Sequence, residues 1–377
     1  MIPRHSEKLI ARLMPQYPVL AITGPRQSGK TTLARKLFGD RPYVSLENPD
    51  EREFAESDPR SFLKRYREGA VFDEVQRAPE LLSYLQQIID EGPKECRFVL
   101  TGSQQFGLMS QISQSLAGRV ANVTLLPFSY SEWYSHKTET PPSLEEVLFK
   151  GLYPPVLDRA LEPSTWYRNY AQTYVERDVR QIAAIGDLRL FHTFLRMCAA
   201  RTGQLLNLSG LASDCGIAVN TAKKWLSILE AGYIIHLLQP HFANFGKRLI
   251  KTPKLYFVDP GLACYLLSVN TSTSLQTHAM RVPLFETYAV SELKKFFENT
   301  GHMGGLYFWR DRAGHEVDIV IDESTGLSAT ELKAGRTVAS DWLKGLQKWK
   351  TIAGSTARDI SLIYGGEREY ERQDARI

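Results

Sequence analysis

Residues 24–31 constrain the fold of this chain most strongly. They carry a complete Gly-x-x-x-x-Gly-Lys-Thr pattern, which lies between a strand-like and a helix-like stretch of sequence. The run before it, residues 18–23, is apolar and β-branched and predicts a buried strand. The run after it, residues 32–38, has helical spacing. A strand–loop–helix unit of this kind turns backbone N–H groups inward around phosphate oxygens. The sequence therefore predicts that the chain binds a nucleoside triphosphate.

The loop supplies its own phosphate and metal ligands. Lys30 is expected to reach the β- and γ-phosphates, while the hydroxyl of Thr31 ligates Mg²⁺. ATP and Mg²⁺ are therefore the expected cofactors. The residues predicted to surround the nucleotide are Gly24, Pro25, Arg26, Gln27, Ser28, Gly29, Lys30, Thr31 and Thr32.

A second apolar run, residues 69–72, predicts a strand that ends in the carboxylates of Asp73 and Glu74. On their own, these two acids would be explained better as an exposed strand end. Beside a phosphate-binding loop, however, Asp73 is expected to hold the Mg²⁺ shell and Glu74 to polarise the attacking water. The pair therefore predicts nucleotide hydrolysis as well as binding.

Two polar residues further along the chain are candidates for completing this reaction centre. Residues 97–100 predict a third strand, and Ser103 follows it at a point where a hydroxyl could sense the γ-phosphate. Arg119 is a candidate cation of the arginine-finger type. An ordinary surface arginine explains Arg119 equally well. The sequence does not decide whether Arg119 would act in its own chain or in a neighbouring copy of a homo-oligomer.

Composition narrows the class of protein but identifies no partner. The length of 377 residues, with 43% apolar and 23% charged side chains, predicts a soluble protein of two or three domains. No apolar run approaches a membrane span and the first residues lack a signal-peptide core, so a cytoplasmic location without a membrane partner is expected. The four cysteines form no Cys-x-x-Cys pair and are expected to be buried thiols. A net charge of +4 is too small to indicate nucleic acid by itself.

The periodicity changes twice along the chain. Short apolar strands alternate with helical segments up to about residue 163, which is typical of a doubly wound α/β domain with a parallel sheet. Helical spacing dominates residues 166–231, and beyond residue 283 the pattern becomes helix, strands, helix, strand. The chain is therefore expected to be an α/β protein of several domains.

The middle segment resembles a winged helix-turn-helix. Residues 208–214 predict a first helix, and Asn220 is expected to cap a second helix that carries Lys223 and Lys224. Residues 233–238 then predict a wing strand. In a DNA complex the two lysines would face phosphates, while Asn220 or Thr221 would face a base edge. A packing or protein-contact role for this module is equally consistent with the sequence.

The last part of the chain carries a second polar constellation. Residues 316–321 and 327–333 predict a hairpin that puts Asp318 beside Glu331 and Lys333, and an amphipathic helix adds Glu286. Two carboxylates that share a metal, with a lysine beside them, are suited to metal-assisted phosphodiester hydrolysis. Surface acids on an exposed hairpin are the alternative explanation.

A series of short motifs runs along the whole chain in a fixed order. They are the phosphate-binding loop, Asp-Glu-Val-Gln at 73–76, Thr-Gly-Ser at 101–103, Leu-Ala-Gly-Arg at 116–119, Pro-Phe-Ser at 127–129, Gly-Leu-Tyr-Pro at 151–154, Tyr-Val-Glu-Arg-Asp-Val at 174–179 and Pro-Lys-Leu-Tyr-Phe-Val-Asp-Pro-Gly at 253–261. As a set, these motifs resemble those of bacterial and archaeal AAA-type ATPases that carry a DUF4143 carboxy-terminal region. Leu152 departs from the family pattern, in which a second glycine is frequent, and this departure concerns a loop more than the chemistry.

The resemblance implies a P-loop ATPase core over residues 1–163, a helical and winged-helix part over 164–260, and a restriction-endonuclease-like domain of the PD-(D/E)xK type over 261–377. It also implies that Asp318, Glu331 and Lys333 occupy the nuclease motif, with Glu286 on the preceding helix as a further metal ligand. Three functions stay open. The ATPase could gate a DNA nuclease, it could be an ATP-switched regulator whose nuclease-like fold is inactive, or it could be a signalling or defence ATPase for which DNA is irrelevant.

Overall fold

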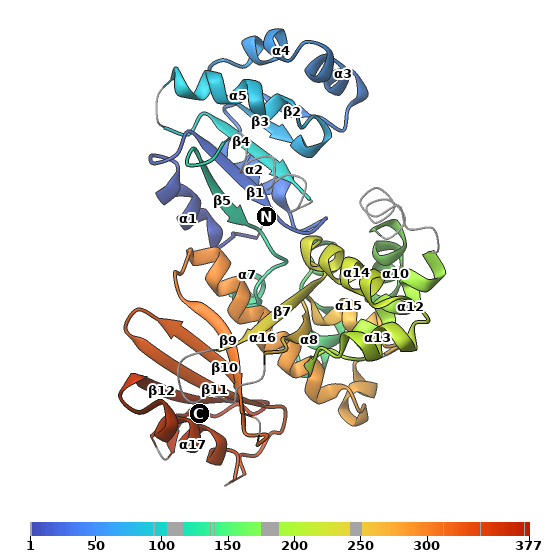
Figure 1. Cartoon of the computed structure of the whole chain (residues 1–377), viewed down its shortest axis with the longest axis vertical. Coiled ribbons are helices and arrows are strands. Elements are labelled where there is room, and N and C mark those ends of the chain that lie inside the picture. Colours follow the sequence, from blue (N-terminus) through green and yellow to red (C-terminus); the bar gives the residue numbers. More distant parts are fainter. Residues whose placement is uncertain are drawn as a thin grey trace.

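The computed structural model of the chain describes residues 2–92, 95–103, 116–135, 137–138, 140–174, 188–241, 251–311, 313–339, 341–372 and 374–377. Residues 175–179 of the expected family motif lie outside these ranges. Figure 1 shows a parallel sheet at one end of the molecule, a carboxy-terminal sheet at the other, and a group of helices beside them. The expected α/β fold class is confirmed.

The amino-terminal sheet is entirely parallel, with the strand order β2-β3-β4-β1-β5. Such an order places the carboxyl ends of all strands at one edge, where open α/β sheets bind their ligands. The strands are β1 (Val19–Thr23), β2 (Tyr43–Ser45), β3 (Ala70–Asp73), β4 (Phe98–Gly102) and β5 (Val120–Thr124).

Both faces of this sheet are covered by helices. Val19 and Ala21 of β1 enter one apolar cluster, while Leu20 and Ile22 enter another. This alternation follows from the two-residue period of a strand and confirms the doubly wound prediction. The covering helices are α1 (Ser6–Leu13), α2 (Lys30–Leu37), α3 (Pro49–Ser57), α4 (Pro59–Arg65) and α5 (Leu81–Asp90), with the short 3₁₀ helix η1 (Val75–Arg77).

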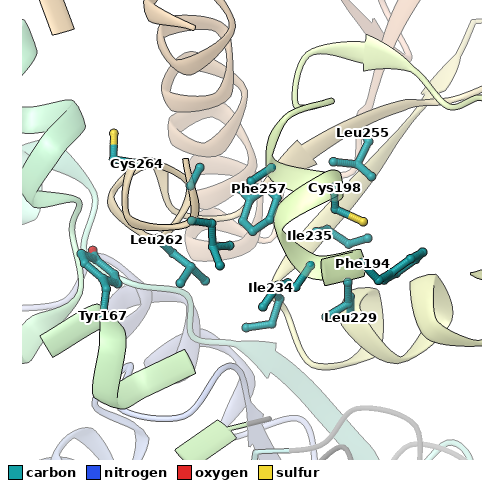
Figure 2. Close-up of a cluster of buried hydrophobic side chains, with 14 of the residues drawn as sticks. Tyr167, Phe194, Cys198, Leu229, Ile234, Ile235, Leu255, Phe257, Leu262 and Cys264 are labelled. Atoms are coloured by element: carbon teal, nitrogen blue, oxygen red, sulfur yellow. The ribbon is translucent and has the colours of Figure 1, made fainter. Parts of the chain in front are cut away.

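The middle of the chain is mainly helical and has a core of its own. Figure 2 shows Phe194 and Cys198 packed near Leu229, Ile234 and Ile235. The four cysteines are free and buried, as predicted. The helices are α7 (Tyr130–Tyr134), α8 (Leu144–Lys150), α9 (Pro154–Asp158), α10 (Pro163–Tyr174), α12 (Leu188–Ala199), α13 (Leu208–Asp214), α14 (Val219–Ala231) and α15 (Pro260–Leu266).

Strands from the middle of the chain extend the carboxy-terminal sheet. β7 pairs antiparallel with β8 and, at its far end, parallel with β9, so the wing-like hairpin continues into a nine-stranded sheet. The hairpin predicted from residues 316–333 is confirmed as β10 and β11. The remaining elements are β6 (Gln204–Leu205), β7 (Ile235–Pro240), β8 (Lys254–Phe257), η3 (Thr273–Thr277), α16 (Arg281–Thr300), β9 (Gly305–Arg310), β10 (Glu316–Glu323), β11 (Gly326–Lys333), α17 (Lys344–Ala353), η4 (Gly354–Thr356), β12 (Ala357–Tyr364), β13 (Glu371–Arg372) and β14 (Ala375–Arg376).

The buried carboxylate of Asp259 accepts hydrogen bonds from three separate parts of the helical region. The side chain is 1% exposed and caps α15 by accepting a hydrogen bond from the Leu262 amide at 3.1 Å. It also accepts from the Leu152 amide at 2.7 Å and from the Tyr167 hydroxyl at 2.6 Å. Burial raises the pKa of Asp259, and these donors act in the opposite direction. The turn between α8 and α9 is thereby held against α10 and α15.

We expect Asp259→Ala to destabilise the protein by about 3 kcal/mol or more, because it leaves the buried amides of Leu152 and Leu262 without their acceptor. Asp58 provides the matched control. It also precedes a proline and caps a helix, α4, through the Ser61 amide at 3.0 Å, but the contact is exposed. Asp58→Ala should cost only about 1 kcal/mol. Urea denaturation of both variants measures the loss in free energy of unfolding. Equal losses would contradict the conclusion that Asp259 stabilises the fold through its buried hydrogen bonds.

Candidate functional site

The phosphate-binding loop leaves β1 and enters α2 through two glycines in left-handed conformations. Gly24 has φ +147°, and an added Cβ there would lie 2.1 Å from the Leu125 carbonyl oxygen. Gly29 has φ +98° and immediately precedes α2. The Nζ of Lys30 donates to the carbonyl oxygens of Gly24 at 3.0 Å and Pro25 at 2.8 Å. The loop therefore wraps around the lysine that its pattern predicts to bind phosphate.

Asp73 lies beside this loop at the end of β3. The Thr31 hydroxyl is 3.2 Å from its Oδ1 atom, and the Tyr43 hydroxyl donates to its Oδ2 atom at 2.5 Å. The Thr101 hydroxyl also donates to Oδ1. Burial, together with the nearby Asp73 carboxylate, raises the pKa of Tyr43 to about 12. Tyr43 was not predicted from the sequence, although its place on β2, the neighbour of β3, is a signal for it.

Glu74 occupies a left-handed turn directly after β3. Its φ of +56° is unusual for a residue with a side chain. The Ser103 hydroxyl donates to Glu74 Oε2 at 3.1 Å, and the Gln76 amide donates to the same oxygen. Glu74 and Ser103, which the sequence assigned to water activation and phosphate sensing, are therefore in direct contact.

A cavity of about 620 Å³ lies over the loop. One wall comes from the amino-terminal sheet domain, and the other comes from α9, the residue after it, and α10. The second wall was not predicted, because its residues lie more than a hundred positions beyond the loop. The lining residues are Arg26, Gln27, Gly29, Lys30, Thr31, Thr32, Glu74, Pro154, Pro155, Asp158, Arg159 and Thr173.

The loop and the end of β3 supply donors that suit Mg²⁺. Thr31 and Asp73 present hard oxygen atoms within 3.2 Å of each other, and Mg²⁺ prefers one or two such side chains together with phosphate oxygens. The buried Oγ atom of Ser28, within the loop, has no hydrogen-bond partner among the described residues. The residues present therefore fit a magnesium nucleotide.

Arg119 lies away from this cavity. It immediately precedes β5, whose parallel pairing with β1 puts its first residue at the edge of the sheet opposite the loop. The guanidinium forms an exposed ion pair with Asp90. Arg119 is therefore not among the residues that line the cavity of its own chain, because β5 leads from Arg119 toward the loop end of the sheet. The sequence left open whether Arg119 acts in its own chain or in a neighbouring copy, and action in a neighbouring copy stays a prediction.

The polar residues predicted near the carboxy terminus do gather at one place. Asp318 Oδ2 accepts a hydrogen bond from the Leu332 amide at 2.9 Å, across the β10–β11 pairing. The ammonium group of Lys333 lies 2.6 Å from Glu331 Oε1. Burial and the nearby charge of Asp318 raise the pKa of Glu286 to about 7, and the same causes raise that of Glu331 to about 7.

Lys254 enters this cluster from β8 and was not predicted. Its side chain is 4% exposed and forms ion pairs with Glu316 and, at 3.6 Å, with Asp318. The Tyr256 hydroxyl donates to Glu286 at 3.5 Å. Within the ranges that the structure describes, no three His, Cys, Asp or Glu side chains are arranged to hold a metal. The metal set predicted from Asp318, Glu331 and Glu286 is therefore not preformed, since a lysine ammonium occupies the cluster.

The two helices of the predicted helix-turn-helix are present as α13 and α14. Ala218, not Asn220, is the residue before α14, so Asn220 lies in the first turn and the prediction that it caps the helix is wrong. Lys223 and Lys224 are exposed. No helix among the described residues is long and apolar enough to span a membrane.

Three family models match consecutive parts of the chain: an AAA domain over residues 16–134, a domain of unknown function, DUF8612, over 141–273, and a domain of unknown function, DUF4143, over 283–377. An uncharacterised protein of Mycobacterium tuberculosis (strain ATCC 25618 / H37Rv) is 28% identical over 375 residues, which cover 98% of this chain and 82% of that protein. An uncharacterised protein of Haemophilus influenzae is 25% identical over 178 residues, 44% of each chain.

Among solved structures, the Walker-type ATPase of Pyrococcus abyssi aligns with a TM-score of 0.50 and 17% identity, covering 71% of this chain and 96% of that one. At this identity the likeness concerns the fold alone. The fold agrees with the parallel sheet and phosphate-binding loop described above. The chain therefore carries an AAA domain of the P-loop ATPase fold and a carboxy-terminal DUF4143 domain, as its motifs predicted.

Proposed function

We propose that this protein binds ATP with Mg²⁺ and hydrolyses it. The observation that carries the proposal is the Thr31–Asp73 contact of 3.2 Å, beside a cavity that Lys30 and Glu74 both line. Lys30 would leave the loop carbonyls and bind the β- and γ-phosphates, while Thr31 and Asp73 would hold Mg²⁺. The bound metal would neutralise the charge that develops on the phosphates. Glu74 would orient the attacking water and Ser103 would sense the γ-phosphate.

Replacing Lys30 tests nucleotide binding directly. We expect Lys30→Ala to weaken binding of ATP by about tenfold to a hundredfold, since a charge-assisted phosphate contact contributes about 1.5–3 kcal/mol. Calorimetry with ATP and Mg²⁺ measures the change. The exposed Lys64 of α4 offers a control with the same loss of charge, and Lys64→Ala should leave the affinity unaltered. Unchanged affinity in Lys30→Ala would overturn the assignment.

Substitutions of Glu74 and of Asp73 are expected to have different effects, the first on hydrolysis and the second on metal binding. Glu74→Gln should retain ATP and Mg²⁺ but slow turnover by about 10²-fold or more, because the amide is a poor base. Asp73→Asn should weaken nucleotide binding only when Mg²⁺ is present. Binding and single-turnover hydrolysis, each with Mg²⁺ and with EDTA, distinguish the two roles. An equal loss of nucleotide affinity in both variants would refute this division.

We further propose that the ATPase part, residues 1–163, acts on a winged-helix part, 164–260, and a nuclease-like part, 261–377. DNA is the proposed partner of the winged-helix part, because Lys223 and Lys224 are exposed on α14. A homo-oligomer in which Arg119 reaches a neighbouring copy, and a cytoplasmic location, stay predictions. The alternative is an ATP-switched regulatory, signalling or defence protein with an inactive nuclease-like fold. The ion pairs of Lys254 favour this alternative, since they neutralise the acids that a metal would need.

If α14 binds duplex DNA, Lys223→Ala/Lys224→Ala should lower the slope of log affinity against log salt by roughly 1.8, because two phosphate contacts are lost. Fluorescence anisotropy over a range of KCl concentrations measures this slope. The control is the double variant Lys344→Ala/Lys348→Ala in α17, because it removes the same charge outside the winged helix. The result contradicts DNA binding by α14 if both double variants show the wild-type slope.

Glu286 should make the protein less stable as the pH rises. Its folded pKa of about 7 lies above the ordinary 4.5, so ionisation between pH 4.5 and 7 costs stability. Glu286→Gln should therefore stabilise the protein at pH 8, by on the order of 1–3 kcal/mol, and have no effect near pH 4.5. Thermal unfolding across this pH range, with the exposed Glu56→Gln as control, measures the effect. A difference in unfolding temperature between Glu286→Gln and the wild type that is the same at all pH values would contradict the raised pKa of Glu286.

Mn²⁺ tests whether the same cluster binds a metal. If Asp318 and Glu331 ligate it, millimolar Mn²⁺ should raise the unfolding temperature of the Asp73→Asn protein at pH 8, because a ligand that binds only the folded state stabilises it. The measurement is made on Asp73→Asn protein, so that the nucleotide site does not contribute. Adding Glu331→Gln should abolish the rise. A rise that persists in this double variant would exclude Glu331 as a ligand.

A further inference from the structure

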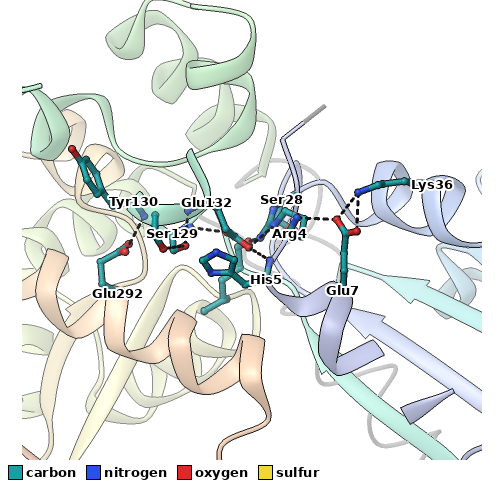
Figure 3. Close-up of polar contacts among 11 residues, drawn as sticks. Arg4, His5, Glu7, Ser28, Lys36, Ser129, Tyr130, Glu132 and Glu292 are labelled. Atoms are coloured by element: carbon teal, nitrogen blue, oxygen red, sulfur yellow. Dashed lines mark hydrogen bonds and ion pairs between the residues drawn. The ribbon is translucent and has the colours of Figure 1, made fainter. Parts of the chain in front are cut away.

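Arg4 lies just before α1 and buries its guanidinium group against the phosphate-binding loop. The residue is 7% exposed. Its Nη1 atom donates to the Ser28 carbonyl at 2.9 Å, and its Nη2 atom donates to the Leu126 carbonyl at 2.6 Å. Figure 3 shows Arg4 between Ser28 and Glu132. One side chain thus joins the loop, the segment after β5 and α7.

The contact with Ser28 determines how the next peptide group is oriented. A trans peptide is planar, so its C=O and N–H bonds point in opposite directions. Because Arg4 binds the Ser28 oxygen on the buried side, the Gly29 N–H on the same peptide must point away from Arg4. Gly29 lines the nucleotide cavity. The arginine therefore keeps this amide turned toward the place where phosphate oxygens would lie.

The backbone around this peptide needs such a restraint. Gln27 has φ +61° although it carries a side chain, and Gly29 has φ +98°. Left-handed conformations at a non-glycine residue cost free energy and persist only where surrounding contacts enforce them. Without a partner for the Ser28 carbonyl, the peptide between Ser28 and Gly29 would be free to rotate. That rotation would turn the amide away from the cavity.

The charge of Arg4 is balanced at the same place. Its Nε atom donates to Glu132 Oε1 at 3.2 Å, and Glu132 is 1% exposed. Glu132 also accepts from the His5 amide at 2.7 Å and the Ser129 amide at 2.8 Å. Burial lowers the pKa of Arg4, and Glu132 acts in the opposite direction. A buried ion pair adds little stability compared with apolar packing, so stability alone does not account for an arginine here.

We propose that Arg4 is a positioning residue for nucleotide binding, which holds the Ser28–Gly29 peptide with its N–H toward the phosphates before the nucleotide arrives. This inference rests on the proposed function of the loop. It assigns to the first residues of the chain, outside the phosphate-binding pattern, a part in the affinity for phosphate. Arg4 touches no substrate and acts through Ser28 and Gly29.

Arg4→Lys keeps the positive charge for Glu132 but cannot reach both carbonyl oxygens. We expect this variant to bind ADP about two- to tenfold more weakly, the equivalent of one lost hydrogen bond. Amide hydrogen exchange of residues 24–31 in nucleotide-free protein should become faster. The exchange measurement detects loss of positioning whether or not nucleotide binds.

Arg281 is the matched control. It is also a largely buried arginine, which donates to the Ala334 carbonyl at 2.7 Å and pairs with Glu145 at 2.8 Å, far from the loop. Arg281→Lys should therefore lower the unfolding temperature without changing ADP affinity or exchange in residues 24–31. If the two substitutions changed ADP affinity and loop exchange equally, Arg4 would only stabilise the fold, and the proposal would be overturned.

The outcomes separate the positioning role from the proposed function. If the wild type binds no ADP but Arg4→Lys speeds exchange in the loop, nucleotide binding fails while the orientation by Arg4 stands. Wild-type affinity and wild-type exchange in Arg4→Lys would reject the role of Arg4 and leave the proposed function intact. Calorimetry with ADP and Mg²⁺ supplies the affinities.

Discussion

The nucleotide cavity depends on how the turn between α8 and α9 is held, because this turn leads into the wall opposite the phosphate-binding loop. Asp259 accepts the Leu152 amide, while the Leu152 carbonyl accepts the Phe128 amide at 3.0 Å. The peptide groups around Leu152 are therefore bonded on one side to α15 and on the other to the segment that follows β5. Pro154 and Arg159 reach the cavity from this anchored position. The site is thus assembled from two parts of the chain, and it is complete only when both are folded.

The same segment connects the loop with the carboxy-terminal part. Ser129 and Glu132 form a capping box at the start of α7, and Glu132 pairs with Arg4. The neighbouring Tyr130 amide donates to Glu292 of α16 at 2.9 Å, and Glu292 is held by the buried Lys295. α16 also carries Glu286. Hydrogen bonds, joined by the peptide link from Ser129 to Tyr130, therefore connect the backbone of the phosphate-binding loop with the helix that contributes to the second polar cluster.

Local patterns in the sequence predicted much of the fold, and long-range contacts account for most of what it did not predict. The loop at 24–31 and the β10–β11 hairpin follow from periodicity and glycine chemistry within a few neighbouring residues. Tyr43, Arg159 and Lys254 meet their sites only through strand order and helix packing, which no local pattern reports. The position of Arg119 relative to the loop could not be predicted from the sequence for a complementary reason. Its motif was recognisable, but the direction of β5 carries it to the opposite edge of the sheet.

The carboxy-terminal cluster shows how buried charge restricts what a site can bind. Four acids, Glu286, Glu316, Asp318 and Glu331, lie near three cations, Lys254, Lys333 and Arg310, which leaves one surplus negative charge that a shared proton would neutralise. Burial, and after it the charge of Asp318, raises the pKa of both Glu286 and Glu331 to about 7. A divalent metal would have to displace that proton and move the Lys254 ammonium, so its affinity would fall as the pH decreases below 7. A nuclease built on this cluster would consequently need the Lys254 side chain to move away from the acids, whereas a regulatory domain would need no such change.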